Sequence, residues 1–336
     1  MFKKNSKLEL YIVTSAVVLA LTVVMLGAYT RLTNAGLGCP DWPGCYGHLV
    51  LPSANQDLTK AQLNYPQVPI EASKAWTEMV HRYAAGLLTL FIFTIGFYNL
   101  WLLYKDKTQA KLLPIMLMLL VLFQAALGMW TVTLKLLPIV VMAHLLGGIL
   151  IFSLLFRLRI QLNHSSTSLR QLSLWQFWIS LGIGLIFCQI ALGGWVSANY
   201  AGIACIGFPQ CNGQWWPPLH MAQGFHLFST VGANYQGGLL ENEVRITIQF
   251  IHRLGAFVVA FYMISLAAVI LWKVKDKAMR VLAILIILLI LIQITLGALN
   301  VIYLLPLSIA VAHNGIAALL LATSLSMLYF TQRRIK

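Results

Sequence analysis

Long apolar segments separated by short polar connectors dominate the pattern of hydrophobic and polar positions along the chain. Each segment runs for about twenty residues, the helix length that crosses the hydrocarbon core of a bilayer. Backbone amides find no water in that core, so a spanning segment has to be helical. The pattern predicts eight membrane-spanning helices, near residues 11–30, 80–103, 112–134, 139–156, 174–196, 246–272, 281–303 and 307–330.

The composition agrees with this pattern. Hydrophobic residues make up 60% of the 336 positions, charged residues only 10%, and the mean hydropathy is +0.81. A soluble domain carries about 25% charged residues. We therefore expect an all-α, polytopic membrane protein.

The net charge of +14 would suit a nucleic-acid binder, but the basic residues separate by side of the membrane. With the N-terminus inside, 16 of the 23 Lys and Arg fall on the face that carries both termini. The positive-inside rule then makes both termini cytoplasmic, and no nucleic-acid partner is needed. The other seven are Arg31, Lys60, Lys74, Arg82, Lys135, Arg245 and Arg253.

The first apolar segment follows a basic start, as a signal peptide would. Its apolar run is longer than the roughly 7–15 residues of a cleaved signal, so we expect an anchoring helix. No Arg- and Ser-rich amphipathic presequence precedes it, which favours the plasma (inner) membrane of a bacterium.

The second half of the chain repeats the first. The third and seventh segments share a Gln-x-x-Leu-Gly motif, at Gln124 and Gln293, and both continue into Leu-Leu-Pro. Equivalent positions are 166 to 171 residues apart, and four spans per half give both copies the same orientation. This predicts two parallel four-helix bundles related by a pseudo-twofold axis along the membrane normal. The expected units are residues 1–160, a cytoplasmic linker 161–173, and residues 174–336.

Four histidines lie within apolar surroundings, His81, His144, His252 and His313, and they form two pairs with spacings of 63 and 61 residues. Topology puts all four near the extracytoplasmic ends of the even-numbered spans, with His81 and His252 at the predicted helix starts. Bundles build cofactor sites from side chains on facing helices, so each half predicts one heme with two imidazole ligands. A lone membrane histidine can instead bond a neighbouring serine or carbonyl. Zinc is a poor competitor, because it collects three or four compactly spaced ligands.

The halves differ beside the first histidine of each pair. Glu78 precedes His81 by three residues, whereas Gln249 precedes His252 by three. At this spacing each shares a helix face with its histidine, which predicts one reactive site and one electron-handling site. The alternative is that Glu78 lies in headgroup water, where its charge suits a helix start.

Arg82 and Arg253 directly follow these two histidines at the membrane boundary. A guanidinium there can donate paired hydrogen bonds to a heme propionate. The alternative is an ordinary boundary arginine whose charge extends to water.

Cysteines stand six residues apart in two loops on the oxidising face, where disulfides persist. We expect two structural disulfides, Cys39–Cys45 and Cys205–Cys211. A thiol pair that exchanges electrons with a partner is the alternative. The role of the long second loop, residues 197–245, stays open.

Taken together, these motifs resemble the heme A synthase family over essentially the whole chain. The resemblance rests on residues 31–33 (Arg-Leu-Thr), residues 36–43 (Gly-Leu-Gly-Cys-Pro-Asp-Trp-Pro), Glu78-x-x-His81-Arg82, His144, His252-Arg253 and His313.

The resemblance implies that the C8 methyl group of heme O is oxidised to the formyl group of heme A, which serves cytochrome oxidase. It also implies that His252 and His313 ligate a heme b cofactor, that His81 and His144 flank the substrate iron, and that Glu78 is the catalytic carboxylate. Two hydroxylations of one methyl would give a geminal diol that loses water to the aldehyde. The expected partners are a heme O synthase, an electron donor, membrane lipid and, in a homo-oligomer, further copies of this chain.

Two other classes remain open on the sequence. A diheme b-type cytochrome that relays electrons would also need paired histidines, although Glu78 against Gln249 argues against two equal sites. A heme transporter or chaperone would suit parallel repeats, but no span is interrupted by the Gly/Pro pair that marks many transport sites.

Overall fold

The structure is a computed structural model that describes residues 7–51, 55–66, 68–105, 112–163 and 175–331. Within these residues it is all-helical, with ten helices and no strand. Eight helices are long and apolar enough to cross a membrane, which confirms the predicted number of spans. They are α1 (Lys7–Leu32), α3 (Ala72–Tyr104), α4 (Leu112–Thr133), α5 (Pro138–Asn163), α6 (Gln176–Ala198), α8 (Asn242–Lys273), α9 (Lys277–Ile302) and α10 (Leu307–Thr331). The short α2 (Asn55–Asn64) and α7 (Met221–Gly224) lie in the connections after α1 and α6.

Two helices begin well before their apolar segments. α3 starts at Ala72 and α8 at Asn242, rather than near residues 80 and 246. Polar and charged side chains interrupt the apolar pattern in these first turns, so hydropathy alone does not reveal that they are helical. The prediction that His81 and His252 stand at helix starts was therefore wrong. At 1.5 Å per residue they lie about 13–15 Å inside their helices.

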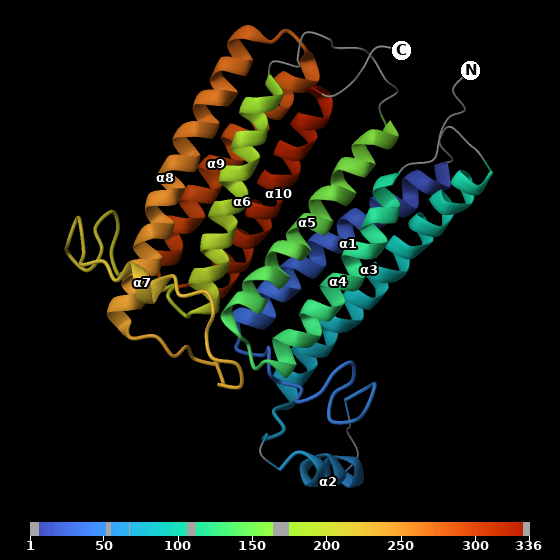
Figure 1. Cartoon of the computed structure of the whole chain (residues 1–336), viewed down its shortest axis with the longest axis vertical. Helices are drawn as coiled ribbons and strands as arrows, with labels where there is room; N and C mark the ends of the chain where they lie inside the picture. The colour runs from blue at the N-terminus through green and yellow to red at the C-terminus, as the bar shows by residue number, and fades with distance from the viewer. Residues whose placement is uncertain (1–6, 52–54, 67, 106–111, 164–174, 332–336) are drawn as a thin grey trace.

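The eight long helices form two four-helix bundles (Figure 1). In the first, α1, α3, α4 and α5 each contact the next in a closed ring, and α6, α8, α9 and α10 do the same in the second. The bundles meet where α5 packs against α6 and α10, and where α1 packs against α10. Equivalent helices thus have equivalent neighbours, while the pseudo-twofold axis itself stays a prediction.

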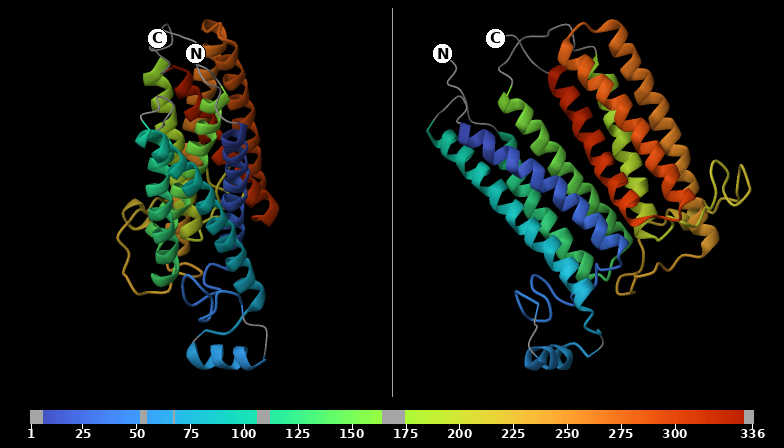
Figure 2. Two further views of the ribbon diagram at one scale, coloured as in Figure 1. Left: turned by 90° about the vertical axis from the view of Figure 1, so that its right-hand side faces the viewer. Right: turned by 180° about the vertical axis from the view of Figure 1, so that it is seen from behind.

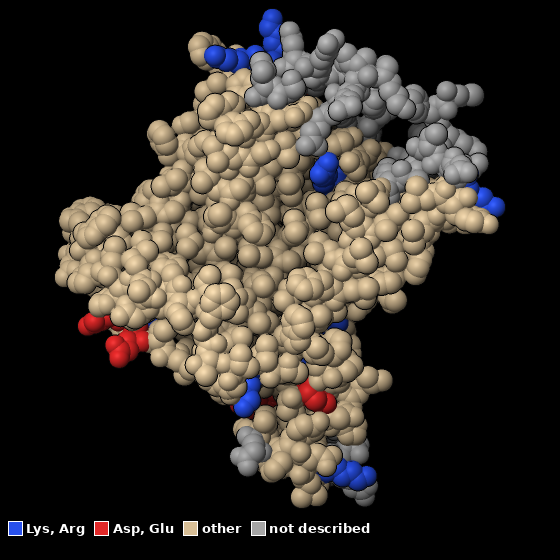
Figure 3. All heavy atoms as spheres, viewed as in Figure 1, with Lys and Arg blue, Asp and Glu red and all other residues tan. Residues whose placement is uncertain are grey.

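The outer surface of the bundles is apolar as well as the core. Leu90, Leu119 and Phe261 are each more than 60% exposed although they lie in the middle of long helices. A space-filling view shows charged side chains mainly toward the two ends and an almost uncharged middle (Figure 3). A helix that is apolar all round is typical of a membrane span. The protein is therefore a multi-pass membrane protein.

The loops that carry the cysteines lie at one end of the bundles, opposite the start of α1 and the end of α10 (Figure 2). The predicted linker 161–173 overlaps the last residues of α5, which continues to Asn163, and its remainder lies outside the described residues. The unit boundaries at residues 160 and 174 stay predictions.

Candidate functional site

Each of the four intramembrane histidine rings lies against a glycine on the neighbouring helix of its own bundle. A Cβ atom added to any of these glycines would lie only 3.0 to 3.2 Å from the histidine Cε1 atom, closer than side chains normally approach. Glycine therefore lets each ring stand in the seam between two helices. The pairs are Gly27 with His81, Gly128 with His144, Gly193 with His252, and Gly297 with His313.

The structure brings together the two histidines of the first half. The ring centroids of His81 and His144 are 6.4 Å apart, with the ring planes at 80°. His81 comes from α3 and His144 from α5, the two helices that flank α4 in the bundle. Both rings point into the same bundle near its loop end. Iron ligation by this pair stays a prediction.

Glutamine side chains hold three of the four histidines. Gln124 Nε2 lies 3.1 Å from His144 Nδ1 and donates to the His144 carbonyl at 2.7 Å. Gln189 makes the same two contacts with His252, at 3.0 and 2.9 Å. Gln293 Nε2 lies 3.1 Å from His313 Nε2.

These glutamines were missed by the sequence analysis, although the signal is present. Each stands four residues before the glycine that faces the same histidine, so both lie on one helix face. The Gln-x-x-Leu-Gly motif that was noted at Gln124 and Gln293 occurs a third time at Gln189. In α1 the corresponding position, four residues before Gly27, is Val23. Among the described residues, an amide side chain lies beside each of the other three histidines but not beside His81.

A cavity of about 670 Å³ occupies the second half and is lined by both His252 and His313. This volume is typical of sites for small ligands and cofactors. Its walls are mainly apolar side chains of α6, α8, α9 and α10, together with Gln189 and Gln293. Loop residues between α6 and α8 line its outer end. His252 and His313 therefore line the same cavity.

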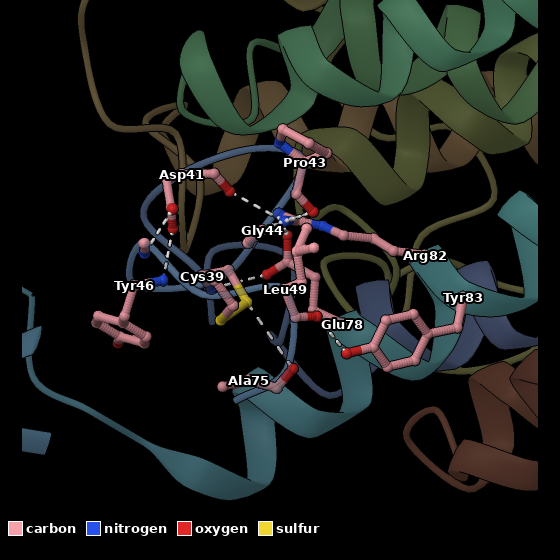
Figure 4. Close-up of a disulfide and its surroundings, with 12 residues drawn as sticks. Cys39, Asp41, Pro43, Gly44, Tyr46, Leu49, Ala75, Glu78, Arg82 and Tyr83 are labelled. Carbon is pink, nitrogen blue, oxygen red and sulfur yellow. Dashed lines mark hydrogen bonds and ion pairs between the residues drawn. A yellow bond between two sulfur atoms is a disulfide. The ribbon is translucent and has the colours of Figure 1, made fainter. Parts of the chain in front are cut away.

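Glu78 does not lie free beside His81 but is bound to the first disulfide loop (Figure 4). Its side chain is buried, with the residue only 4% exposed, and Oε2 accepts from the Cys39 backbone N–H at 2.9 Å. Oε1 forms an ion pair with Arg82. This arrangement fixes the carboxylate about one helical turn from His81.

Arg82 completes the attachment of that loop to α3. Its Nη1 atom donates to the carbonyls of Asp41 at 2.9 Å, Pro43 at 3.2 Å and Gly44. Beneath the same loop, burial first and then the nearby carboxylates raise the pKa of the Tyr46 phenol above its usual value. The first loop is therefore held to the helix end by a buried carboxylate and its arginine, and the Tyr46 hydroxyl donates to the Pro69 carbonyl at 3.2 Å.

The second half repeats the attachment without a carboxylate. Arg253 donates to the carbonyls of Gly207 at 2.8 Å, Gln210 at 3.1 Å and Cys205. Gln249, at the position of Glu78, donates to the Gly202 carbonyl at 3.3 Å. Both arginines thus bind loop carbonyls, and the predicted propionate contacts of Arg82 and Arg253 stay predictions.

Both predicted disulfides are confirmed, Cys39–Cys45 and Cys205–Cys211. Across the described part of the chain, no group of three or more His, Cys, Asp or Glu residues is placed to hold a metal ion.

The long second loop folds back over the loop end of both halves. Trp195 Nε1 donates to the Gly224 carbonyl at 2.7 Å, which fastens α7 to α6. The Tyr235 amide donates to the Lys135 carbonyl at 3.0 Å, in the connection between α4 and α5. The loop therefore covers the cavity and links the two bundles, an arrangement that no motif in its sequence indicated.

Comparisons with known proteins show to which family the chain belongs. The sequence model of the cytochrome oxidase assembly protein (COX15-CtaA) family matches residues 10–325. A heme A synthase of Shewanella oneidensis is 45% identical over 321 residues, covering 93% of either chain. Heme A synthases of Neorickettsia sennetsu and Wolbachia pipientis are 27% and 28% identical over 93% and 94% of this chain, and 95% and 91% of their own. The duplicated helical bundle with its paired histidines therefore belongs to the COX15-CtaA family of cytochrome oxidase assembly proteins.

Proposed function

We propose that the protein is a heme A synthase that oxidises the C8 methyl group of heme O to the formyl group of heme A. The relative from Shewanella oneidensis carries that name and matches nearly the whole chain. The observation that carries the proposal is the duplicated pair of histidines, with the buried carboxylate Glu78 before His81 where the second half has Gln249 before His252. Two equal sites would not need this difference.

A heme b cofactor fits the cavity of the second half. The cavity is apolar, reaches both His252 and His313, and has three arginines but no Asp or Glu among its lining residues. A planar group with an apolar body and anionic carboxylates suits such walls. His252 and His313 would hold its iron, with Gln189 and Gln293 setting the orientation of the two rings.

The first half would bind heme O between His81 and His144. A methyl group is inert toward acid or base alone, so bound iron supplies the oxidising chemistry. The protein contributes the two imidazoles, the enclosing helices, and a proton acceptor. Glu78 is the candidate acceptor, because the Cys39 amide and Arg82 hold its carboxylate on the His81 side of α3.

The exchange of Glu78 for glutamine tests this assignment. Glu78→Gln keeps the size of the side chain and a carbonyl oxygen that can accept from the Cys39 amide. We expect normal heme content but at least a hundredfold loss of heme A, the lower range for a general acid or base. The measurement is mass analysis of pigments from cells that express the chain with a heme O source. Glu71→Gln, which makes the same exchange at an exposed carboxylate just before α3, is the matched control and should leave heme A formation within severalfold. Unchanged heme A in a folded, heme-loaded Glu78→Gln protein would remove Glu78 from the chemistry.

The proposed setting is the bacterial inner membrane, with both termini in the cytoplasm and the histidine pairs toward the extracytoplasmic side. The excess of Lys and Arg at the end that carries the termini supports this orientation. A heme O synthase as supplier and an electron donor are the partners that the reaction requires.

A further inference from the structure

An arginine from the first half lines the cavity of the second half. Arg31, in the last turn of α1, reaches across to α6, where Nη2 donates to the carbonyl of Ser197. Its guanidinium lies 3.9 Å from the centroid of the Tyr200 ring. One turn earlier on the same helix, Gly27 faces His81 of the first half. α1 thus contributes to both histidine sites.

A second arginine stands at the same end of the cavity. Arg245 precedes His252 on α8 by seven residues, which is about two helical turns, so it lies on the same face about 10 Å further out. Its Nε atom donates to the Leu240 carbonyl at 2.7 Å and Nη2 to the Gly238 carbonyl at 3.2 Å. These bonds fix its guanidinium at the outer end of the cavity, of which it is a lining residue.

The two guanidinium groups have more donors than the described part of the chain occupies. Each carries five N–H groups. The described hydrogen bonds use one donor of Arg31 and two of Arg245, in addition to the contact of Arg31 with Tyr200, and the Arg31 Nε is buried without an acceptor. Both side chains are partly buried, and a cation that is withdrawn from water without a counter-charge is costly. No Asp or Glu is among the described residues that line this cavity, so a carboxylate of the ligand would supply the counter-charge.

We infer that Arg31 and Arg245 form a carboxylate-binding subsite that holds the propionates of the heme in the second half. The inference rests on the proposed function, in which His252 and His313 hold that heme. It assigns the propionates to arginines other than Arg253, whose guanidinium has three loop carbonyls as partners.

The subsite also distinguishes the two halves. The repeat offset of 166 residues that relates Gly27 to Gly193 relates Arg31 to Ser197. At this position the second half therefore has a serine, and no arginine that could extend into the first half. A site with this extra cation suits a permanently bound cofactor.

Heme titration of the full chain tests the subsite. The chain carries His144→Ala, so that only the second half offers two imidazoles, and the probes are iron protoporphyrin IX and its dimethyl ester, which lacks the carboxylates. Binding is followed by the absorption spectrum in detergent. Arg31→Ala and Arg245→Ala should each weaken protoporphyrin binding by about ten- to a hundredfold, as expected for a lost charge-assisted pair. Binding of the ester should change less than threefold. Lys60→Ala, which removes an exposed lysine of α2 at the same end of the molecule, should change neither.

Each other result contradicts a separate part of the account. Equal weakening of both probes would make Arg31 a packing residue of the interface between the bundles and overturn the subsite. Unchanged protoporphyrin binding in both arginine variants would do the same. If binding in the background chain survives His252→Ala, the heme is not held by His252, and the proposed site falls together with its subsite.

Discussion

At the scale of single residues, each of the four histidine sites depends on a glycine as well as on the side chains around the ring. A glycine opposite each ring makes room for it, and a glutamine one turn away holds three of the four rings. Second-sphere partners of this kind orient a ligand and are typically worth ten- to a hundredfold in metal affinity. Three of the four sites therefore repeat one arrangement, in which a glutamine and a glycine four residues apart on one helix both contact a histidine of the neighbouring helix.

Gly193→Ala should disturb the second site directly. The new Cβ would lie 3.1 Å from His252 Cε1, so the ring has to move. We expect at least a tenfold loss of heme b, visible as loss of the low-spin spectrum of the purified protein. Gly184→Ala on the same helix is the matched control, because its Cβ would meet no atom within 4 Å. If both variants keep full heme b, His252 does not need this glycine.

Gln189→Leu removes the hydrogen bonds to His252 while keeping a side chain of similar length. We expect about ten- to a hundredfold weaker heme b binding and a shifted midpoint potential. Gln124→Leu is the counterpart in the first half and should leave heme b unchanged while altering only the substrate site. The same effect of both variants on heme b would contradict the division into two separate sites.

The histidines and the Glu78 difference could be predicted from residue type, because polar groups within apolar segments are conspicuous. The glycines were not recognised as ring contacts, since a glycine in a membrane helix has many ordinary reasons to occur. Gln189 was missed because the Gln-x-x-Leu-Gly motif was recognised only at Gln124 and Gln293. Arg31 was counted among the charges of the loop end and in the Arg-Leu-Thr motif, but its reach into the other half could not be predicted, because it depends on how the bundles pack.

At the scale of elements, α3 and α8 begin before their apolar segments and hold the two disulfide loops through partly buried arginines. Hydropathy predicted the membrane-spanning parts but started these two helices too late, because their first turns include polar residues. Cysteine spacing predicted the disulfides correctly. Arg82 and Arg253 hold both loops through backbone carbonyls. Every residue has a backbone carbonyl, so the residue types in the loops do not predict this attachment.

Arg82→Ala should destabilise the protein far more than Arg253→Ala. Removing Arg82 leaves the buried Glu78 carboxylate without its ion-pair partner, a change that costs about 3–5 kcal/mol. The equivalent Arg253 faces neutral Gln249 and leaves no buried charge behind. Thermal unfolding in detergent and the rate of reduction of Cys39–Cys45 measure the difference. The double variant Arg82→Ala/Glu78→Gln should recover part of the stability. Equal losses in the two single variants would show that the ion pair is not the cause.

At the scale of the whole molecule, the two bundles are joined through α1, α5, α6 and α10, and the long second loop ties their outer ends together. The number of spans and the duplication could be predicted, because lipid imposes a fixed length and the motifs recur at a nearly constant offset. The long second loop and the cavity that it lines could not be predicted, since they arise from contacts between distant segments. Arg31 makes the second site dependent on the first half.

Reporter fusions test the orientation of the whole chain. Green fluorescent protein fused after Lys336 should fluoresce, because it folds in the cytoplasm. Alkaline phosphatase inserted near Gly232, in the second loop, should be active, because it needs the oxidising side. A dark terminal fusion together with inactive phosphatase would show that the chain has the opposite membrane orientation, with the histidine pairs toward the cytoplasmic side.

The central claim is that the two histidine pairs hold different hemes, one as substrate and one as cofactor. The most direct measurement is extraction and mass analysis of the pigments bound to the full chain purified from cells with a heme O source. The account predicts heme b together with heme O or heme A in the wild type. In His252→Ala heme b alone should be lost, and in His144→Ala the heme O and heme A should be lost while heme b remains. Heme b as the sole pigment of the wild type, lost in part from either variant, would contradict the account and make the protein an electron relay.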